Sequence, residues 1–150
     1  MRTDVASRHI HAPPAEIFAA LIDPTALVAW LPPQGMSGRF EHFDCRPGGS
    51  YRLVLTYEEP TAAAKTTTDS DVVDGRFVEI LPDVRIVQAV AFVSDHPEYD
   101  GTMTMSWELA PNGGGADVHF RAENVPPGIS AEDHARGLAS SLANLARYVE

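Results

Sequence analysis

The stretch Phe43-Asp44-Cys45-Arg46-Pro47-Gly48-Gly49-Ser50-Tyr51 constrains the fold more than any other part of the sequence. Pro47 fixes its own φ angle at about −65°, and the two glycines that follow permit positive φ angles. The chain must therefore reverse its direction here. The stretch predicts two strands joined by a tight turn that sets the register of the hairpin.

Alternating apolar residues extend this pattern along the chain. They predict a first strand at 5–11 and further strands near 36–45, 50–58, 72–81, 84–94, 102–110 and 116–123. Turn residues separate these strands at Pro82-Asp83, Asp100-Gly101 and Asn112-Gly113-Gly114-Gly115. Such short connections favour an antiparallel meander. The polar segment 59–71 is predicted to be the least ordered part, or a loop whose position depends on a ligand.

Helical spacing appears in two places. After Pro13-Pro14 a short helix is predicted that ends at Asp23-Pro24, and a second short helix then runs toward Trp30. Ser130 can cap a long helix at about 131–148. One apolar stripe follows this helix at Leu138, Leu142, Leu145 and Val149. We expect the stripe to pack against the curved sheet, the only surface long enough to cover it.

Length and charge limit the classes of function. A chain of 150 residues with 44% hydrophobic residues fits one globular domain spanning 1–150, which can bury about 70% of its extended-chain surface. The formal net charge of −10 disfavours a nucleic-acid partner. The single lysine, Lys65, stands among threonines in a polar segment, so Schiff-base chemistry is not predicted.

The cysteine content and the N-terminus bear on location. Cys45 is the single cysteine, so the chain cannot form an intrachain disulfide. The N-terminus lacks a basic region followed by an apolar core, and no stretch reaches the ~18 apolar residues of a membrane span. We therefore expect a cytoplasmic monomer or homodimer with no membrane span and no cofactor.

Spaced motifs resemble those of a known family. They are Ala12-Pro13-Pro14-Ala15-Glu16-Ile17-Phe18, Asp23-Pro24, Trp30, Asp44-x-Arg46-Pro47-Gly48-Gly49-x-Tyr51, Gly75-Arg76-Phe77 and Ile80-x-Pro82. The chain resembles the family named for homology to the activator of the heat-shock protein 90 ATPase, within the START and birch-pollen-allergen-like (SRPBCC) superfamily. Many relatives carry Gly-Trp in the last helix, where this chain has Gly137-Leu138.

The resemblance implies an α+β helix-grip fold. In this fold a curved antiparallel sheet of about seven strands wraps the long C-terminal helix, and two short helices follow the first strand. A cavity between sheet and helix takes small apolar or amphipathic molecules. Because Leu138 stands where many relatives have Trp, the resemblance implies that the cavity is filled differently in this chain.

Strand alternation and the last helix together indicate which residues face this cavity. Met103, Met105, Trp107 and Leu109 share one strand face, and Tyr51, Leu53, Leu55 and Tyr57 share another. These side chains could line an adaptable pocket or simply pack in the core, and we expect a mixed role. The predicted ligand-binding residues are Tyr51, Tyr57, Met103, Met105, Trp107, His134, Leu138 and Leu142.

Other chemically capable residues have simpler interpretations. His42 and Asp44 could form a carboxylate-oriented general base, but Asp44 and Arg46 more simply brace the hairpin. Arg46 could lower the pKa of the Cys45 thiol, although a buried and inert cysteine is favoured.

Metal and phosphate sites are not predicted. His9, His11 and His119 lack the spacing of a metal site. The Asn112-Gly113-Gly114-Gly115 run favours a hairpin turn over a phosphate cradle, because it lacks the strand-to-helix setting of such a cradle.

Three functions remain open. The first is binding of a small hydrophobic or aromatic molecule for carriage, sensing or sequestration. The second is a cyclase or dehydratase acting on a carbonyl or polyketide-like substrate, with His42, Tyr57, Glu58 or His134 as acid or base. The third is contact with a chaperone, which the family name alone suggests. No recognisable catalytic constellation stands in the sequence, so the catalytic residues, if any, are unknown.

Overall fold

The computed structural model describes residues 2–33, 35–58 and 70–150. Within these residues, seven strands form one antiparallel sheet in the order β1-β7-β6-β5-β4-β3-β2. The strands are β1 (Thr3–Ile10), β2 (Met36–Phe43), β3 (Ser50–Tyr57), β4 (Ser70–Leu81), β5 (Arg85–Phe92), β6 (Met103–Asn112) and β7 (Gly115–Glu123). The helices are α1 (Pro14–Ile22), α2 (Pro24–Trp30), α3 (Ala131–Val149) and the short 3-10 helix η1 (Pro97–Tyr99). The predicted helix-grip fold is confirmed.

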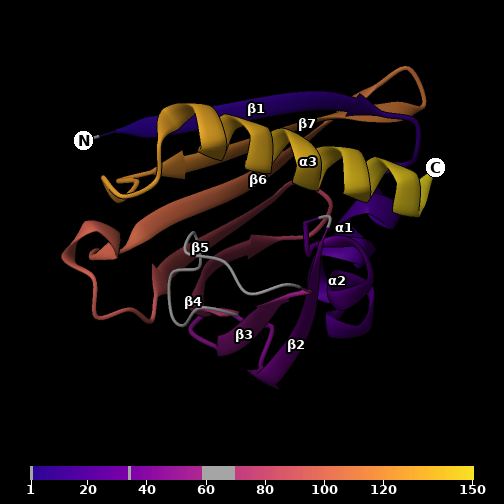
Figure 1. Ribbon diagram of the computed structural model, residues 1–150. Coiled ribbons are helices and arrows are strands. Elements are labelled where there is room, and N and C mark those ends of the chain that lie inside the picture. The colour runs from indigo at the N-terminus through magenta and orange to yellow at the C-terminus, as the bar shows by residue number, and fades with distance from the viewer. Residues whose placement is uncertain (1, 34, 59–69) are drawn as a thin grey trace.

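The long helix α3 lies along the sheet beside β1 and β7, and α1 and α2 sit near its C-terminal end (Figure 1). Leu138, Leu142 and Leu145 are at most 3% exposed, and Val149 packs against the same core at its edge. The predicted apolar stripe is therefore the face by which α3 joins the core. The helix begins as predicted at Ser130, whose Oγ accepts a hydrogen bond from the Asp133 backbone N–H at 3.0 Å.

The turn between β2 and β3 is tied to a third strand. Gly48 has a φ angle of 84°, which a residue with a side chain rarely adopts. Its backbone N–H donates to the Phe77 carbonyl at 2.8 Å, and the Phe77 N–H donates to the Gly49 carbonyl at 2.9 Å. The Pro-Gly-Gly turn thus fixes the register of the β2–β3 hairpin and also its position against β4.

Several boundaries differ from the predicted ones because hydrogen bonds, not residue type, end a strand. The strand predicted at 36–45 ends at Phe43, since Arg46 N–H donates back to the Asp44 carbonyl and starts the turn. The hairpin of β6 and β7 extends until Asn112 pairs with Gly115, leaving two residues in the turn.

Part of the predicted loop 59–71 also proves to be strand. Ser70 and Asp71 belong to β4, where they pair with Thr56 and Leu55. Residues 59–69, and with them Lys65, lie outside the described residues. None of the helices in the described part of the chain is long and apolar enough to span a membrane.

Candidate functional site

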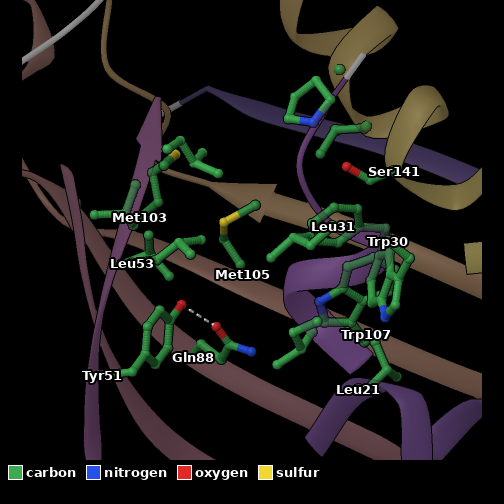
Figure 2. Close-up of a pocket in the computed structure, with 18 of the residues that line it drawn as sticks. Leu21, Trp30, Leu31, Tyr51, Leu53, Gln88, Met103, Met105, Trp107 and Ser141 are labelled. Atoms are coloured by element: carbon green, nitrogen blue, oxygen red, sulfur yellow. Dashed lines mark hydrogen bonds between the residues drawn. The ribbon is translucent and has the colours of Figure 1, made fainter. Parts of the chain in front are cut away.

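A cavity of about 230 Å³ lies where α3 and the two short helices meet the sheet. Its walls are mostly apolar and aromatic. Apart from the indole N–H groups of the two tryptophans, the polar side-chain groups in the wall belong to Tyr51, Gln88, His134 and Ser141. The lining residues are Leu21, Leu27, Trp30, Leu31, Pro33, Phe40, Phe43, Tyr51, Leu53, Leu55, Val73, Phe77, Gln88, Val90, Phe92, Met103, Met105, Trp107, Phe120, His134, Gly137, Leu138 and Ser141. Most of them are drawn in Figure 2, with Met105 near the centre of the view.

Six of the eight residues predicted from the sequence line this cavity. They are Tyr51, Met103, Met105, Trp107, His134 and Leu138. Leu142 instead packs in the core with 1% of its surface exposed. The Tyr57 hydroxyl donates to Oδ2 of Asp71 at 3.1 Å, and its pKa is raised to about 12 by burial first and then by the Asp71 carboxylate. Ligand contact by any of the eight stays a prediction.

Tyr51 and Gln88 form a polar pair on the sheet face that lines the cavity. The Tyr51 hydroxyl donates to Oε1 of Gln88 at 2.6 Å, the interaction dashed in Figure 2. Tyr51 belongs to β3 and Gln88 to β5, so the phenol spans the intervening strand β4. It does so over Gly75, its cross-strand partner, which has no side chain to block the ring. Burial raises the pKa of the Tyr51 phenol, which therefore stays protonated.

Aromatic rings build another part of the wall. Trp107 of β6 stacks on Phe120 of β7 with ring centroids 3.7 Å apart, and Trp30 of α2 meets Trp107 edge-on at 5.7 Å. The Trp30 indole N–H donates to the Ala20 carbonyl at 3.0 Å, which pins the ring to the end of α1. The short helices thus supply a fixed aromatic surface to the cavity.

His134, in the first turn of α3, is bonded to β1. Its Nδ1 lies 2.7 Å from Oδ2 of Asp4, and the two side chains are only 13% and 10% exposed. The same Asp4 oxygen accepts a hydrogen bond from Arg2 at 3.1 Å. This ionisable cluster connects the first strand to a cavity-lining side chain.

The other catalytic candidates do not converge on the cavity. His42 is exposed and its Nε2 lies 3.1 Å from Oγ of Ser50, not beside Asp44. Asp44 instead pairs with Arg46 at 2.7 Å, which is the bracing role predicted for it. Burial first, and then the Asp44 carboxylate, raise the pKa of the Cys45 thiol, opposite to the lowering considered from the sequence.

His9 and His119 make local contacts on the β1–β7 surface. Nδ1 of His9 lies 2.8 Å from Oδ1 of Asp117, and Nδ1 of His119 lies 2.8 Å from Oγ of Ser7. The hydrogen bond from His9, and a second from Asn112, hold the pKa of Asp117 below its usual range. Among the described residues, no group of three or more His, Cys, Asp or Glu side chains is arranged to hold a metal ion.

Comparison with known proteins fits this geometry. The model of the family described as "Activator of Hsp90 ATPase homolog 1-like protein" matches residues 11–150. The chain belongs to this family. A crystal structure of protein CV1439 from Chromobacterium violaceum is 31% identical, covers 99% of this chain and 96% of its own, and has a TM-score of 0.88.

More distant structures share the fold. A solution structure of a protein from Arthrobacter aurescens has a TM-score of 0.81 at 14% identity, covering 98% of this chain and 85% of that one. Protein NE0264 from Nitrosomonas europaea has a TM-score of 0.75 at 22% identity, covering 98% and 93%. No curated protein matches the sequence.

Two polar cavity residues of this family member, Gln88 and Ser141, were not predicted from the sequence, although each has a visible signal. Gln88 stands between Ile86 and Val90 on the buried face of β5, where a polar residue interrupts the apolar alternation. Ser141 follows Leu138 by three positions and therefore shares its face of α3. A polar residue on an apolar face is the signal that points to a cavity.

Proposed function

We propose that this member of the family binds a small hydrophobic or aromatic molecule in the cavity between α3 and the sheet, as a carrier, sensor or sequestering protein. The observation that carries the proposal is the cavity itself, about 230 Å³ in volume, with aromatic and aliphatic walls and a few oriented polar groups. An apolar cavity of about 150 Å³ already accepts a benzene ring. The volume therefore suits a molecule of one or two rings.

The polar groups support binding more than catalysis. Of the four acid or base candidates named from the sequence, only His134 lines the cavity, while His42 and Glu58 are exposed and Tyr57 is bonded to Asp71. A cyclase or dehydratase would need at least two such groups converging on a substrate. Contact with a chaperone has the family description as its support, and the cavity favours a small molecule. We also propose a cytoplasmic location, because Cys45 is the single cysteine and cannot form an intrachain disulfide.

A cavity-filling variant tests the proposal. Leu138 lines the cavity and is 3% exposed, so Leu138→Trp should direct the larger ring into the open volume. We expect binding of the two-ring fluorophore 1-aminonaphthalene to weaken by at least tenfold, with thermal unfolding little changed. Val84→Trp adds the same ring at an exposed site and should leave probe binding unchanged.

Failure of the wild-type protein to bind either 1-aminonaphthalene or naphthalene would contradict the proposal. Equal affinity in the wild-type protein and in Leu138→Trp, together with clear destabilisation of the variant, would place the probe outside this cavity and Leu138 in packed core.

A further inference from the structure

The cavity contains one histidine whose proton position is set by a partner outside the cavity. Nδ1 of His134 lies 2.7 Å from Oδ2 of Asp4, and a carboxylate oxygen accepts but does not donate hydrogen bonds. Nδ1 therefore carries the hydrogen of this contact. In a neutral imidazole the other nitrogen, Nε2, is then a hydrogen-bond acceptor.

The partner is itself held in place. Oδ2 of Asp4 also accepts a hydrogen bond from Arg2 at 3.1 Å, so the carboxylate is fixed from two sides and its charge is balanced by the guanidinium. Only 10% of the Asp4 side chain is exposed, which limits competition from water. Asp4 is thus a positioning residue that orients the His134 ring.

The ring nitrogen without a partner in the described part of the chain belongs to a side chain that lines the cavity. Among the described residues, Nε2 of His134 makes no hydrogen bond, while the His134 side chain lines the cavity. Leu138 and Ser141 follow four and seven positions later on the same face of α3 and also line it. Ser141 lies on the far side of Met105 from the Tyr51–Gln88 pair in Figure 2. The helix wall therefore has its own polar groups, distinct from those of the sheet.

The charge of the lining limits which ligand this nitrogen can serve. None of the described residues that line the cavity is Lys, Arg, Asp or Glu. A ligand carboxylate would enter an apolar space without a fixed cation, which is unfavourable. A neutral hydroxyl needs only an acceptor, and the aromatic surface of Trp107 and Phe120 suits a flat ring beside it.

We propose that the cavity recognises an aromatic hydroxyl compound, a phenol or a naphthol, whose O–H donates a hydrogen bond to Nε2 of His134. The assignment rests on the proposed function and specifies the ligand class for that same cavity. The apolar walls take the ring, and the His134–Asp4 pair distinguishes the hydroxyl compound from its ether or hydrocarbon analogue. A single hydrogen bond of ordinary strength should give about 3- to 10-fold discrimination.

Two matched probes test the assignment. Titration calorimetry should show that 2-naphthol binds the wild-type protein about 3- to 10-fold more tightly than 2-methoxynaphthalene, which has the same rings without the donor. His134→Phe keeps an aromatic ring and removes the acceptor, so the two probes should bind it equally. His42→Phe is the control, because His42 is exposed and bonded to Ser50 outside the cavity, and it should retain the discrimination.

A second measurement needs no variant of His134. Nitrogen NMR of histidine-labelled protein should show the hydrogen on Nδ1 of His134, and 2-naphthol should shift the Nε2 resonance while 2-methoxynaphthalene should not. In Asp4→Asn the ring should lose its fixed tautomer and the discrimination should fall, with 2-methoxynaphthalene affinity unchanged.

The outcomes separate the two proposals. Equal affinity of the wild-type protein for both probes would overturn the hydroxyl assignment but would still support binding of a small aromatic molecule in the cavity. Tighter binding of 2-naphthoate than of 2-naphthol would overturn it in favour of a carboxylate ligand. Absence of binding by either naphthalene probe would overturn the cavity proposal and this assignment with it.

Discussion

The ring of Tyr51 lies directly over the backbone of Gly75, so close that a Cβ atom at Gly75 would overlap the ring carbons. The two residues are cross-strand partners on β3 and β4. Because Gly75 has no side chain, the phenol crosses β4 and its hydroxyl reaches Oε1 of Gln88 on β5 at 2.6 Å. The glycine on β4 thus makes the Tyr51–Gln88 hydrogen bond in the cavity wall possible.

Gly75→Ala should therefore displace the Tyr51 ring and break its bond to Gln88. We expect the free energy of unfolding to fall by about 1–3 kcal/mol, the usual effect of overpacking a close-packed core. Urea unfolding of the variant measures the change. In a Tyr51→Ala background the same substitution should have a much smaller effect, because the ring that it meets is gone. An equal loss in both backgrounds would show that the cost lies in the backbone of β4.

Gly137→Ala should instead raise the free energy of unfolding. Gly137 is an interior residue of α3 and lines the cavity. A Cβ atom added there would have no neighbour within 4 Å apart from the backbone of its own helix. Alanine stabilises a helix interior by about 0.5–1 kcal/mol relative to glycine, so the free energy of unfolding should rise by that amount. Chemical denaturation checks it, with Ala139→Gly at an exposed position of the same helix as the matched reverse change. Destabilisation by Gly137→Ala would mean that the space beside the glycine is closed.

The stripe on α3 gives a third test. Leu142 is 1% exposed among core side chains, so Leu142→Ala should lower the free energy of unfolding by about 2–5 kcal/mol through lost burial and a new cavity. Arg136→Ala, an exposed change on the same helix, should stay within about 0.5 kcal/mol of wild type. The two variants are compared by their denaturation midpoints, provided that the dependence of the unfolding free energy on denaturant concentration is the same. A loss below about 0.5 kcal/mol for Leu142→Ala would remove that residue from the core.

The fold was predictable because local chemistry and long-range packing agree along the chain. Pro47 and the two glycines dictate a reversal, Ser130 caps a helix, and the spacing of Leu138, Leu142 and Leu145 calls for a surface to cover. The cavity was predictable only in part. Alternation assigns Tyr51 and Tyr57 to the same strand face. It does not show that the missing side chain of Gly75 lets the Tyr51 phenol reach Gln88, or that the Tyr57 hydroxyl bonds to Asp71.

The His134–Asp4 pair illustrates why the rest of the site was missed. The two residues are 130 positions apart, and only the pairing of β1 with β7 at the sheet edge brings β1 beside α3. Asp4 stands in a short polar stretch that has no distinguishing pattern in the sequence. Contacts between segments at opposite ends of a chain depend on the order of strands in the sheet, which the residue spacing of a single sequence does not contain.

The Arg52–Asp74 pair predicts how acid affects stability. Arg52 of β3 binds its cross-strand partner Asp74 through two hydrogen bonds, Nε to Oδ1 at 2.6 Å and Nη2 to Oδ2 at 2.8 Å. The hydrogen bonding from Arg52 holds the pKa of Asp74 below its usual range. A carboxyl whose folded pKa is lowered stabilises the fold above its unfolded pKa of about 3.9, and this contribution disappears as the pH falls through the folded value.

Asp74→Asn should therefore be less stable than wild type at pH 7, by no more than about 1 kcal/mol because the pair is partly exposed. The difference should stay constant from pH 8 to pH 5 and shrink below about pH 4, as wild type protonates Asp74 and the variant has nothing to titrate there. Urea unfolding across this range measures it at low salt. Asp95→Asn, at an exposed loop position, should show no acid-dependent difference. A difference between Asp74→Asn and wild type that persists unchanged to pH 2 would show that packing, and not the carboxylate charge, is the source of the stabilisation.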